Sequence, residues 1–329
     1  MAHDLPAPVR LWLADQVKGR RLAALKDEHT GVSAHYRAGG PSSGVIDSDA
    51  AILSYALARM PATFAATGAA LARLGDHAPD FAPKSALDIG CGPGTALIAA
   101  LEAFPGLETV TGVDHNAPFL AFARRMIDAT GHAAGRTVTL TGGDLAKPWQ
   151  ADPADLVLSS YALVELAEAA ALTAIRHAWA LTRGALVLIE PGSRAGFSRI
   201  RTARAALLAE GARLLAPCPH HAPCPMVEPD WCHFSIRLAR SREHRLIKGG
   251  DAPFEDEKFS YLIAARTAPA VPAADRIIAP PRRSKPALDL TLCTGDGTIR
   301  HRTFALRETG TKAIRKCDWG DALPRPRNS

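Results

Sequence analysis

The 329-residue sequence predicts an α/β fold built on a mostly parallel sheet. Between residues 84 and 192, short apolar runs such as SALDIG, TVTGVD and DLVLSSY alternate with alanine-rich segments that have the composition of helices. This alternation is typical of βαβ units, whose parallel strands are covered by helices on both faces. A glycine-rich loop directly after the first of these runs favours the same fold class.

The first 80 residues are predicted to form a helical region. The stretches PVRLWLADQVKGRRLAALKDE and AAILSYALARMPATFAATGAALARLG both place apolar residues at helical spacing. A break rich in Gly, Ser and Pro at residues 39–44 separates the two stretches. Pro61 lies inside the second stretch, and its missing N–H predicts a kink or a split in that helix.

The C-terminal part begins with a predicted basic helix, RIRTARAALLAEGARLL, followed by two strands within CHFSIRLAR and FSYLIAAR. After a proline-rich basic connector, ALDLTLCTGDGTIRHRTFAL predicts a hairpin that turns at residues 295–297. We therefore divide the chain into a helical region, a sheet domain with a cysteine-rich insertion, and a small basic β-rich extension. Their boundaries are 1–80, 81–268 with the insertion at 216–234, and 269–329.

Basic side chains are concentrated in this C-terminal part. Residues 1–193 contain 15 Lys and Arg against 19 Asp and Glu, whereas residues 194–329 contain 24 against 14. The second part therefore carries a net charge of +10, although the whole chain carries only +6. Such asymmetry favours RNA as a partner, with a merely solvated basic surface as the alternative. The cations expected to contact phosphates are Arg199, Arg201 and Arg204 on the helix, and Arg282, Arg283 and Lys285 in the connector.

No run approaches the roughly 20 apolar residues that a membrane-spanning helix needs. The N-terminal stretch MAHDLPAPVRLWLADQ has an early acid and two prolines and lacks an apolar signal core, so no signal peptide is expected. The expected location is the cytoplasm, where clustered cysteines favour metal over disulfides. We expect no membrane partner and a free protein that is a monomer.

The loop in ALDIGCGPGTALIAA carries Gly90, Gly92 and Gly94, which allow a tight turn and a close approach of the backbone to a ligand. The N–H groups at the start of the following helix favour an anionic group such as a carboxylate. Asp114 ends the next apolar run, twenty residues after Gly94, where an acid can hold ribose hydroxyls. The spacing G-x-G-x-G differs from the dinucleotide pattern, so another nucleoside-containing cofactor is expected.

With Asp88 two residues before the first glycine, the loop resembles motif I of class I S-adenosylmethionine (SAM)-dependent methyltransferases. GGDL at 142–145 then matches the adenine-side acidic position, Asp144. The alternative is a degenerate fold that no longer binds the cofactor. Cys91, inside the loop, is interpreted as a small buried filler. The resemblance implies a SAM site formed by Asp88, Gly90, Gly92, Gly94, Asp114 and Asp144.

The substrate side of this site lacks a known catalytic motif. SSYALVEL at 159–166 occupies the place where substrate meets cofactor, without the Asn/Asp-Pro-Pro-aromatic motif of base-amino methyltransferases or the Pro-Cys nucleophile of the cytosine-C5 type. Tyr161 can stack on a base, but a tyrosine that ends a buried strand is more often structural. The catalytic residues therefore stay unassigned.

The stretch CPHHAPCPMVEPDWCHF places Cys218, Cys224 and Cys232 in one window, spaced C-x5-C-x7-C. Zinc modules use shorter spacings, whereas a four-iron, four-sulfur cluster takes four cysteines that need not be close in sequence. The fourth ligand would then be Cys293 or Cys317, because Cys91 belongs to the glycine loop.

Two other interpretations of this window stay open. One of His220, His221 and His233 can join the three thiolates in a mixed zinc site. Unliganded thiols are the third possibility, although an exposed set would be an oxidation liability. On any metal-binding interpretation, the window ties the basic extension to the sheet domain.

A set of segments extends the resemblance over nearly the whole chain: YRAGG near 36–40, SYALARMPAT at 54–63, LDIGCGPGTAL, LVLIEPG, the cysteine window and FEDEKFSYL. Together they resemble the methyltransferase-like small ribosomal subunit family, which includes the mitochondrial methyltransferase-like protein seventeen and bacterial Rsm-twenty-two-type relatives. The cysteine window and FEDEKFSYL are the most specific parts.

The resemblance implies a methyltransferase-fold factor with an iron–sulfur cluster that acts on the small ribosomal subunit and its rRNA during assembly. Its cluster ligands carry over onto Cys218, Cys224, Cys232 and, by best match, Cys293. The family's mitochondrial members are regarded as inactive, which agrees with the missing catalytic motif. An active rRNA methyltransferase is the alternative, and a small-molecule methyltransferase is a weaker one because a small substrate needs no strongly basic surface.

Overall fold

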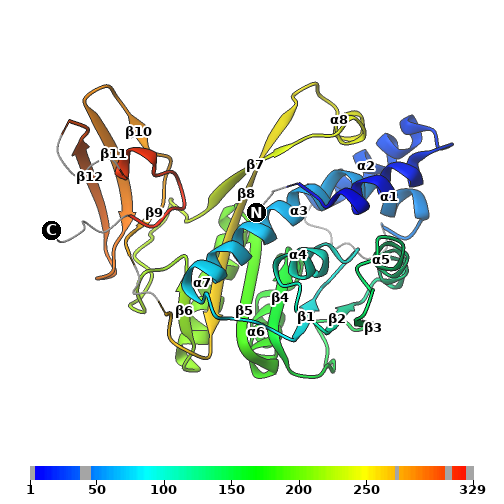
Figure 1. Ribbon diagram of the computed structural model, residues 1–329, viewed down its shortest axis with the longest axis horizontal. Helices are drawn as coiled ribbons and strands as arrows, with labels where there is room; N and C mark the ends of the chain where they lie inside the picture. Colours follow the sequence, from blue (N-terminus) through cyan, green and yellow to red (C-terminus); the bar gives the residue numbers. More distant parts are fainter. Residues whose placement is uncertain (1–3, 38–45, 271–273, 308–312, 324–329) are drawn as a thin grey trace.

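The main sheet of the computed structural model contains eight strands (Figure 1). The structure describes residues 4–37, 46–270, 274–307 and 313–323, with the backbone alone for 32–37, so the predicted break at 39–44 lies outside it. The strands are β1 (Ser85–Ile89), β2 (Thr109–Asp114), β3 (Thr137–Gly142), β4 (Ala154–Ser160), β5 (Thr182–Pro191), β6 (Arg213–Ala216), β7 (Phe234–Ala239) and β8 (Phe254–Ala265). Their order is β3-β2-β1-β4-β5-β8-β6, with β7 paired to β8.

Strands β1 to β5 are parallel, and β8 runs antiparallel between β5 and β6. The helices that connect them are α4 (Thr95–Ala103), α5 (Ala117–Ala129), α6 (Glu168–Leu181) and α7 (Arg194–Ala209). Alternate side chains of β4 enter two cores: Leu156 and Leu158 pack with α4 and α5, whereas Val157 packs with α6 and α7. This arrangement confirms the predicted α/β class I methyltransferase-like fold.

Three N-terminal helices precede the sheet: α1 (Ala7–Val17), α2 (Leu22–Arg37) and α3 (Asp49–His77). The first predicted helical stretch is divided because Gly19 adopts a φ of +75°, which a helix does not allow. Of the two outcomes predicted at Pro61, a kink or a split, the split does not occur, since α3 continues through this residue. A proline removes one intrahelical hydrogen bond, and the burial of its neighbours Met60 and Ala62 offsets that loss. No described helix is long and apolar enough to cross a membrane.

The predicted basic helix ends earlier than its sequence suggested. Ser193 caps α7 by accepting a hydrogen bond from the Gly196 N–H, and the helix ends before Gly211, whose φ is +82°. The RLL segment that follows belongs to β6 instead. The loop after β6, residues 217–233, is the cysteine loop, and it leads into β7.

A second, smaller sheet contains β9 (Arg276–Ile277), β10 (Arg282–Arg283), β11 (Ala287–Cys293) and β12 (Ile299–Ala305). The predicted hairpin is confirmed: β11 pairs with β12 in antiparallel register, and Thr294 donates its N–H to the Thr298 carbonyl in the turn. Leu288, Leu290 and Leu292 build a separate core under this sheet. Figure 1 shows the small sheet at one end of the molecule and α1 and α2 at the other.

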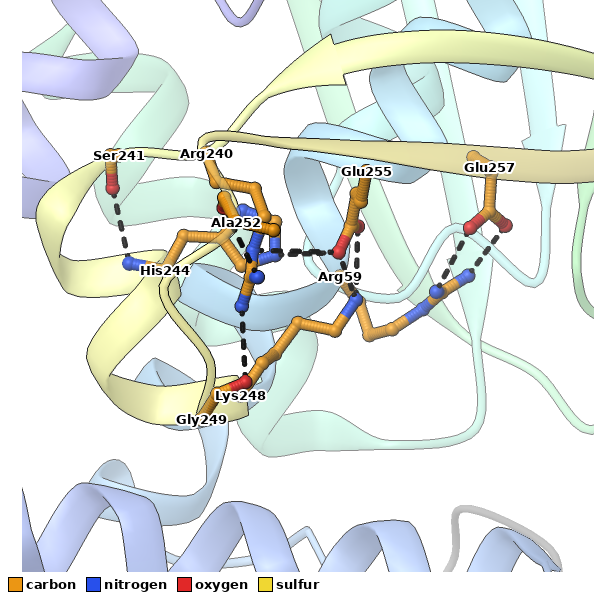
Figure 2. Close-up of polar contacts among 9 residues, drawn as sticks. All are labelled: Arg59, Arg240, Ser241, His244, Lys248, Gly249, Ala252, Glu255 and Glu257. Atoms are coloured by element: carbon orange, nitrogen blue, oxygen red, sulfur yellow. Dashed lines mark hydrogen bonds and ion pairs between the residues drawn. The ribbon is translucent and has the colours of Figure 1, made fainter.

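The arm, residues 234–258, is formed by β7, α8 (Arg242–Lys248) and the first half of β8. Two carboxylates on one side of β8 hold it in place, as Figure 2 shows. Glu255 accepts hydrogen bonds from Lys248 Nζ at 2.7 and 2.9 Å and lies 3.5 Å from His244 Nε2. Glu257 binds both terminal nitrogens of Arg59 on α3, at 3.1 and 3.3 Å. The Glu257–Arg59 ion pair therefore fixes the arm to α3, whereas the Glu255 contacts hold α8 against β8 within the arm.

Candidate functional site

The glycine loop turns sharply between β1 and α4. Gly90, Gly92 and Gly94 have φ values of +70°, +50° and +82°, the left-handed region that glycine tolerates best. A Cβ on Gly90 would lie 2.3 Å from the Cβ of Ala162, so only glycine fits there. The predicted filler role of Cys91 agrees with its burial, 5% exposed, against the sheet.

Asp114 fixes this loop to the end of β2. Its Oδ2 accepts a hydrogen bond from the Gly92 N–H at 2.7 Å, and its Oδ1 accepts one from the Asn116 N–H at 2.8 Å. Burial raises the pKa of this carboxyl group, and the two backbone donors act in the opposite direction. Asp114 therefore holds the glycine loop in shape and also lines the pocket next to that loop.

Asp88 lies in β1, behind the loop, and is fully buried. Neither of its carboxylate oxygens has a hydrogen-bond partner among the described residues. Burial, followed by the charge of Asp114, raises the pKa of Asp88 well above its ordinary value. An unpaired buried carboxyl group is costly, so it points to a ligand or a water at this end of the strand.

A pocket of about 830 Å³, its opening included, lies beside the loop. It is formed at the carboxyl ends of β1, β2 and β4, where the strand order of an open α/β sheet reverses and ligands bind. Four of the six predicted cofactor residues line it, and Asp88 and Gly94 do not. The four are Gly90, Gly92, Asp114 and Asp144.

Asp144 is a partly exposed acid of this pocket, with 37% of its side chain accessible. It accepts a hydrogen bond from the Ala146 N–H at 2.9 Å and pairs with Lys147 at 3.0 Å. These two contacts lower the pKa of its carboxyl group. Asp144 is therefore ionised and open to solvent on the side predicted to face an adenine.

Tyr161 has a φ of +61°, a strained backbone conformation for a residue with a side chain. Its hydroxyl donates to Glu257 Oε1 at 2.8 Å, and the Arg59 guanidinium lies 5.4 Å from the ring centre. The Tyr161 hydroxyl is thus committed to a buried network, and burial raises its pKa well above the ordinary value. Sequence reasoning missed Arg59 and Glu257 as the partners of Tyr161, although FEDEKFSYL was singled out as specific.

Glu190 is a second buried acid that sequence reasoning missed. Its two carboxylate oxygens accept hydrogen bonds from the Leu163 and Val164 N–H groups at 3.0 Å each. Burial raises the pKa of this carboxyl group to about 8. It holds the turn after β4 that closes the substrate side of the pocket, and an acid within the apolar run LVLIEPG was the available signal.

A second cavity lies between the main sheet and the small sheet. It has a volume of about 590 Å³, its opening included, and four cysteines line it: Cys218, Cys224, Cys232 and Cys293. Three come from the cysteine loop, and Cys293 comes from the end of β11. Cys317 does not line this four-cysteine cavity; it packs into the core of the small sheet.

The four-cysteine cavity is apolar and its thiols affect one another. Burial raises the pKa values of Cys218, Cys232 and Cys293, that of Cys293 to about 12. For Cys232 and Cys293, the neighbouring cysteines raise the pKa further. Without a metal, these three groups are neutral thiols near pH 7. Within the described ranges, no three Cys, His, Asp or Glu side chains converge as ligands of a single ion.

The three histidines of the window take separate places. His220 Nε2 lies 3.4 Å from Cys293 Sγ, His221 accepts a hydrogen bond from the Leu214 N–H, and His233 stacks on Trp231. Of the three, His220 is the one in contact with a cavity cysteine. It is therefore the histidine available to a mixed thiolate–imidazole site.

The structure corrects the set of arginines expected to contact RNA. Arg204 is 4% exposed and points into the four-cysteine cavity, where its Nε donates to Cys218 Sγ at 3.3 Å. Arg199 is mostly covered and donates to the Leu166 carbonyl. Arg204 lies on the face of α7 that packs against the core, whereas the sequence prediction had assigned it to the solvent-exposed face. Of the predicted set, Arg201, Arg282, Arg283 and Lys285 are exposed.

The sequence pattern of the family described as "Mitochondrial small ribosomal subunit Rsm22" matches residues 49–324. The chain belongs to the Rsm22 family. The match covers the cofactor pocket and all four cavity cysteines, so both sites lie within the part of this Rsm22-family chain that defines the family.

Two curated relatives resemble this Rsm22-family chain at similar levels. The human ribosome assembly protein METTL17, mitochondrial, is 29% identical over 83% of this chain and 62% of its own length. The Rsm22-cox11 tandem protein 2, mitochondrial, of Schizosaccharomyces pombe is 29% identical over 84% of this chain and 43% of its own length. The chain thus spans about three fifths or less of these relatives.

Solved structures with similar folds are more distant. Magnesium protoporphyrin IX methyltransferase from Synechocystis superposes with a TM-score of 0.42 and 16% identity, covering 73% of this chain and 97% of that one. A TehB-like SAM-dependent methyltransferase from Corynebacterium glutamicum gives 0.38 and 17%, covering 60% and 88%. The fold class of the Rsm22-family chain rests on its own strand order.

Proposed function

We propose that this chain acts on the small ribosomal subunit during its assembly, as a methyltransferase-like factor that binds SAM and an iron–sulfur cluster. The observation that carries this proposal is the family match over residues 49–324, which includes the walls of both sites. One curated relative is named a ribosome assembly protein, which supports the same role for this chain.

The pocket fits SAM. It opens at the carboxyl ends of β1, β2 and β4, the place where an open α/β sheet binds its ligand. In this proposal Asp114 meets the ribose hydroxyls and the partly exposed carboxylate of Asp144 meets the adenine, whereas Asp88 is buried behind the glycine loop and does not line the pocket. When bound, SAM supplies an activated methyl group, and the protein supplies position.

The four-cysteine cavity fits a four-iron, four-sulfur cluster. Its donor set is four cysteines around one apolar cavity, the ligand number that such a cluster requires. Zinc is the alternative at the same cysteines, with His220 as the available imidazole donor. The cluster would be a redox centre that also joins the cysteine loop to β11.

The RNA surface in this proposal consists of exposed cations of the C-terminal part. Arg201 lies on α7, Arg282 on β10, and Lys285 just before β11, and all three are exposed. Arg302 on β12 is exposed as well and lies 4.8 Å from the Phe304 ring, a pairing of cation and aromatic suited to RNA. These side chains are free to meet phosphates, unlike Arg204.

Sedimentation tests the ribosomal role. We expect the protein to migrate with immature small subunits in a sucrose gradient. An Arg282→Ala/Lys285→Ala variant should bind them more weakly, whereas the matched control Arg176→Ala, an exposed arginine on α6, should bind as the wild type does. A wild-type protein that stays at the top of the gradient, or that is spread evenly over the small-subunit and large-subunit fractions, would contradict the proposal.

An active rRNA methyltransferase is the second candidate, favoured by the open pocket beside Gly90, Gly92 and Asp114. Maps of rRNA modification from cells with and without the gene separate the two functions. The assembly role alone predicts identical maps and a deficit of mature small subunits. A single methyl group missing from the small-subunit rRNA would establish the enzyme instead.

A further inference from the structure

Two buried arginines from different elements line the four-cysteine cavity. Arg204 extends from α7 and is 4% exposed, and Arg276 extends from β9 and is 2% exposed. Arg204 donates from Nε to Cys218 Sγ and from Nη2 to the carbonyls of His220 and Ala222, at 3.0 and 2.6 Å. Both guanidiniums belong to the cavity wall.

Neither guanidinium has an acidic partner in the part of the chain that the structure describes. The ion pairs found there use other cations. Arg276 binds the carbonyls of Pro217 and Gly320 and the ring of His77, which are all uncharged acceptors or neighbours. Carbonyl oxygens satisfy N–H groups but carry no net charge. Two buried positive charges therefore remain uncompensated, an expensive state for an apolar interior.

We propose that Arg204 and Arg276 are the counter-charges of an anionic metal–thiolate centre, and that Arg204 sets its reduction potential. This inference rests on the proposed cluster. A four-iron, four-sulfur core with four thiolate ligands carries a net charge of about −2 in its oxidised form, which two guanidiniums balance. Reduction adds a further negative charge, so a nearby cation favours the reduced form.

Arg204 has the stronger role because it contacts a ligand directly. Hydrogen bonds to the sulfur atoms and local charge are two of the factors that set the potential of such clusters. The Nε of Arg204 supplies both at Cys218, whereas Arg276 bonds to the Pro217 carbonyl next to it and acts through its charge. Arg204 is thus a positioning residue for the centre and not one of its ligands.

The test compares Arg204→Gln, Arg204→Lys and the control Arg176→Gln, an exposed arginine of α6 paired with Glu210. Each protein is purified anaerobically, and its midpoint potential is measured by a mediated redox titration followed by electron paramagnetic resonance. We expect Arg204→Gln to have a lower potential than the wild type, Arg204→Lys to shift less, and the control to match the wild type. A purely structural role for Arg204 predicts that both substitutions act alike.

Iron retention covers the case in which Arg204→Gln holds too little cluster to titrate. Iron release to a ferrous chelator should then be several-fold faster in Arg204→Gln than in Arg204→Lys. Equal rates of iron release from both variants, or a midpoint potential that is the same in Arg204→Gln as in the wild type, would overturn the inference. Either result would leave the proposed cluster in place. A wild type without iron would overturn the proposed cluster and this inference with it.

Discussion

The cofactor pocket and the four-cysteine cavity are built in opposite ways. The pocket is formed by short segments that directly follow parallel strands, so the loop after β1 and the end of β2 carry its walls. The cavity collects residues from α7, the cysteine loop, β9 and β11, and Cys293 follows Cys232 by about sixty positions in the sequence. The first site is a property of the fold class, whereas the second depends on how the C-terminal sheet docks.

The two sites also differ in how their charges are satisfied. Asp114 is tied to two backbone N–H groups, so the pocket is shaped even when empty. In the cavity, three raised thiol pKa values and two arginines without acidic partners leave an excess of positive charge. The pocket is thus preorganised before a ligand binds, whereas the proposed cluster would supply the negative charge that the cavity lacks.

Removing the metal should have the largest effect and should separate the two regions. A cluster that joins distant segments restricts the chain as a cross-link does. After the iron is removed, we expect amide hydrogen exchange to speed up in residues 217–233 and 287–293, with β1, β4 and β5 unchanged. Exchange that accelerates equally in both regions would show that the cavity and the pocket form one cooperative unit.

Asp114→Ala should have the next largest effect, confined to the pocket. Two hydrogen bonds from ribose hydroxyls to a carboxylate contribute on the order of 2–4 kcal/mol, so the affinity for SAM should fall by roughly 30- to 1,000-fold. Calorimetry measures this change, and Asp144→Ala, at a more exposed acid, should cost less. An unchanged affinity for SAM in Asp114→Ala would contradict the assignment of this pocket. A larger loss of affinity in Asp144→Ala than in Asp114→Ala would contradict it as well.

The salt dependence of RNA binding tests the exposed cations of the C-terminal part. With Arg204 buried, contacts to about four phosphates are expected, and affinity for RNA should fall by about two orders of magnitude between roughly 50 and 200 mM salt. The double substitution Arg282→Ala/Lys285→Ala should reduce the slope by about 2, and Arg176→Ala should not change it. A flat salt response of the wild type would mean that the basic face is only solvated.

The smallest effect is expected in the arm, away from both sites. The cations around Glu255 lower the pKa of its carboxyl group to about 2, so its stabilising contribution is present above about pH 4.5 and is lost as the pH falls toward 2. Glu255→Gln should cost about 1 kcal/mol at pH 7 and almost nothing near pH 2, as measured by denaturant unfolding. Asp256→Asn, at an exposed pair with Arg237, should stay within about 0.5 kcal/mol. A constant cost of Glu255→Gln across this pH range would show that the ion pairs do not stabilise the arm.

Sequence patterns predicted those parts of the structure that depend on local geometry. The glycine loop, Asp114 and the hairpin of β11 and β12 follow from short-range rules of turns and strands, and the structure agrees. Arg204 was placed on the wrong face because a run of arginines on a helix does not tell which side the core covers. Pro61 does not end α3, because tertiary packing keeps the helix continuous.

The partners of distant residues could not be derived from spacing. The choice of Cys293 over Cys317 came from a family resemblance, and the structure adds that Cys293 lines the cavity while Cys317 packs elsewhere. Glu257 contacts both Arg59 and Tyr161, although Arg59 and Glu257 are about 200 positions apart in the sequence. No periodicity in the sequence encodes such a contact.

The central claim is that the four-cysteine cavity holds one four-iron, four-sulfur cluster, and iron analysis of anaerobically purified protein tests it most directly. The wild type and Cys317→Ser should each contain about four irons per chain and a broad absorbance near roughly 400 nm, whereas Cys293→Ser should lose both. Circular dichroism of the three proteins controls for folding. A wild type that carries one zinc and no iron would contradict the claim, and iron that depends on Cys317 but not on Cys293 would move the fourth ligand out of the cavity.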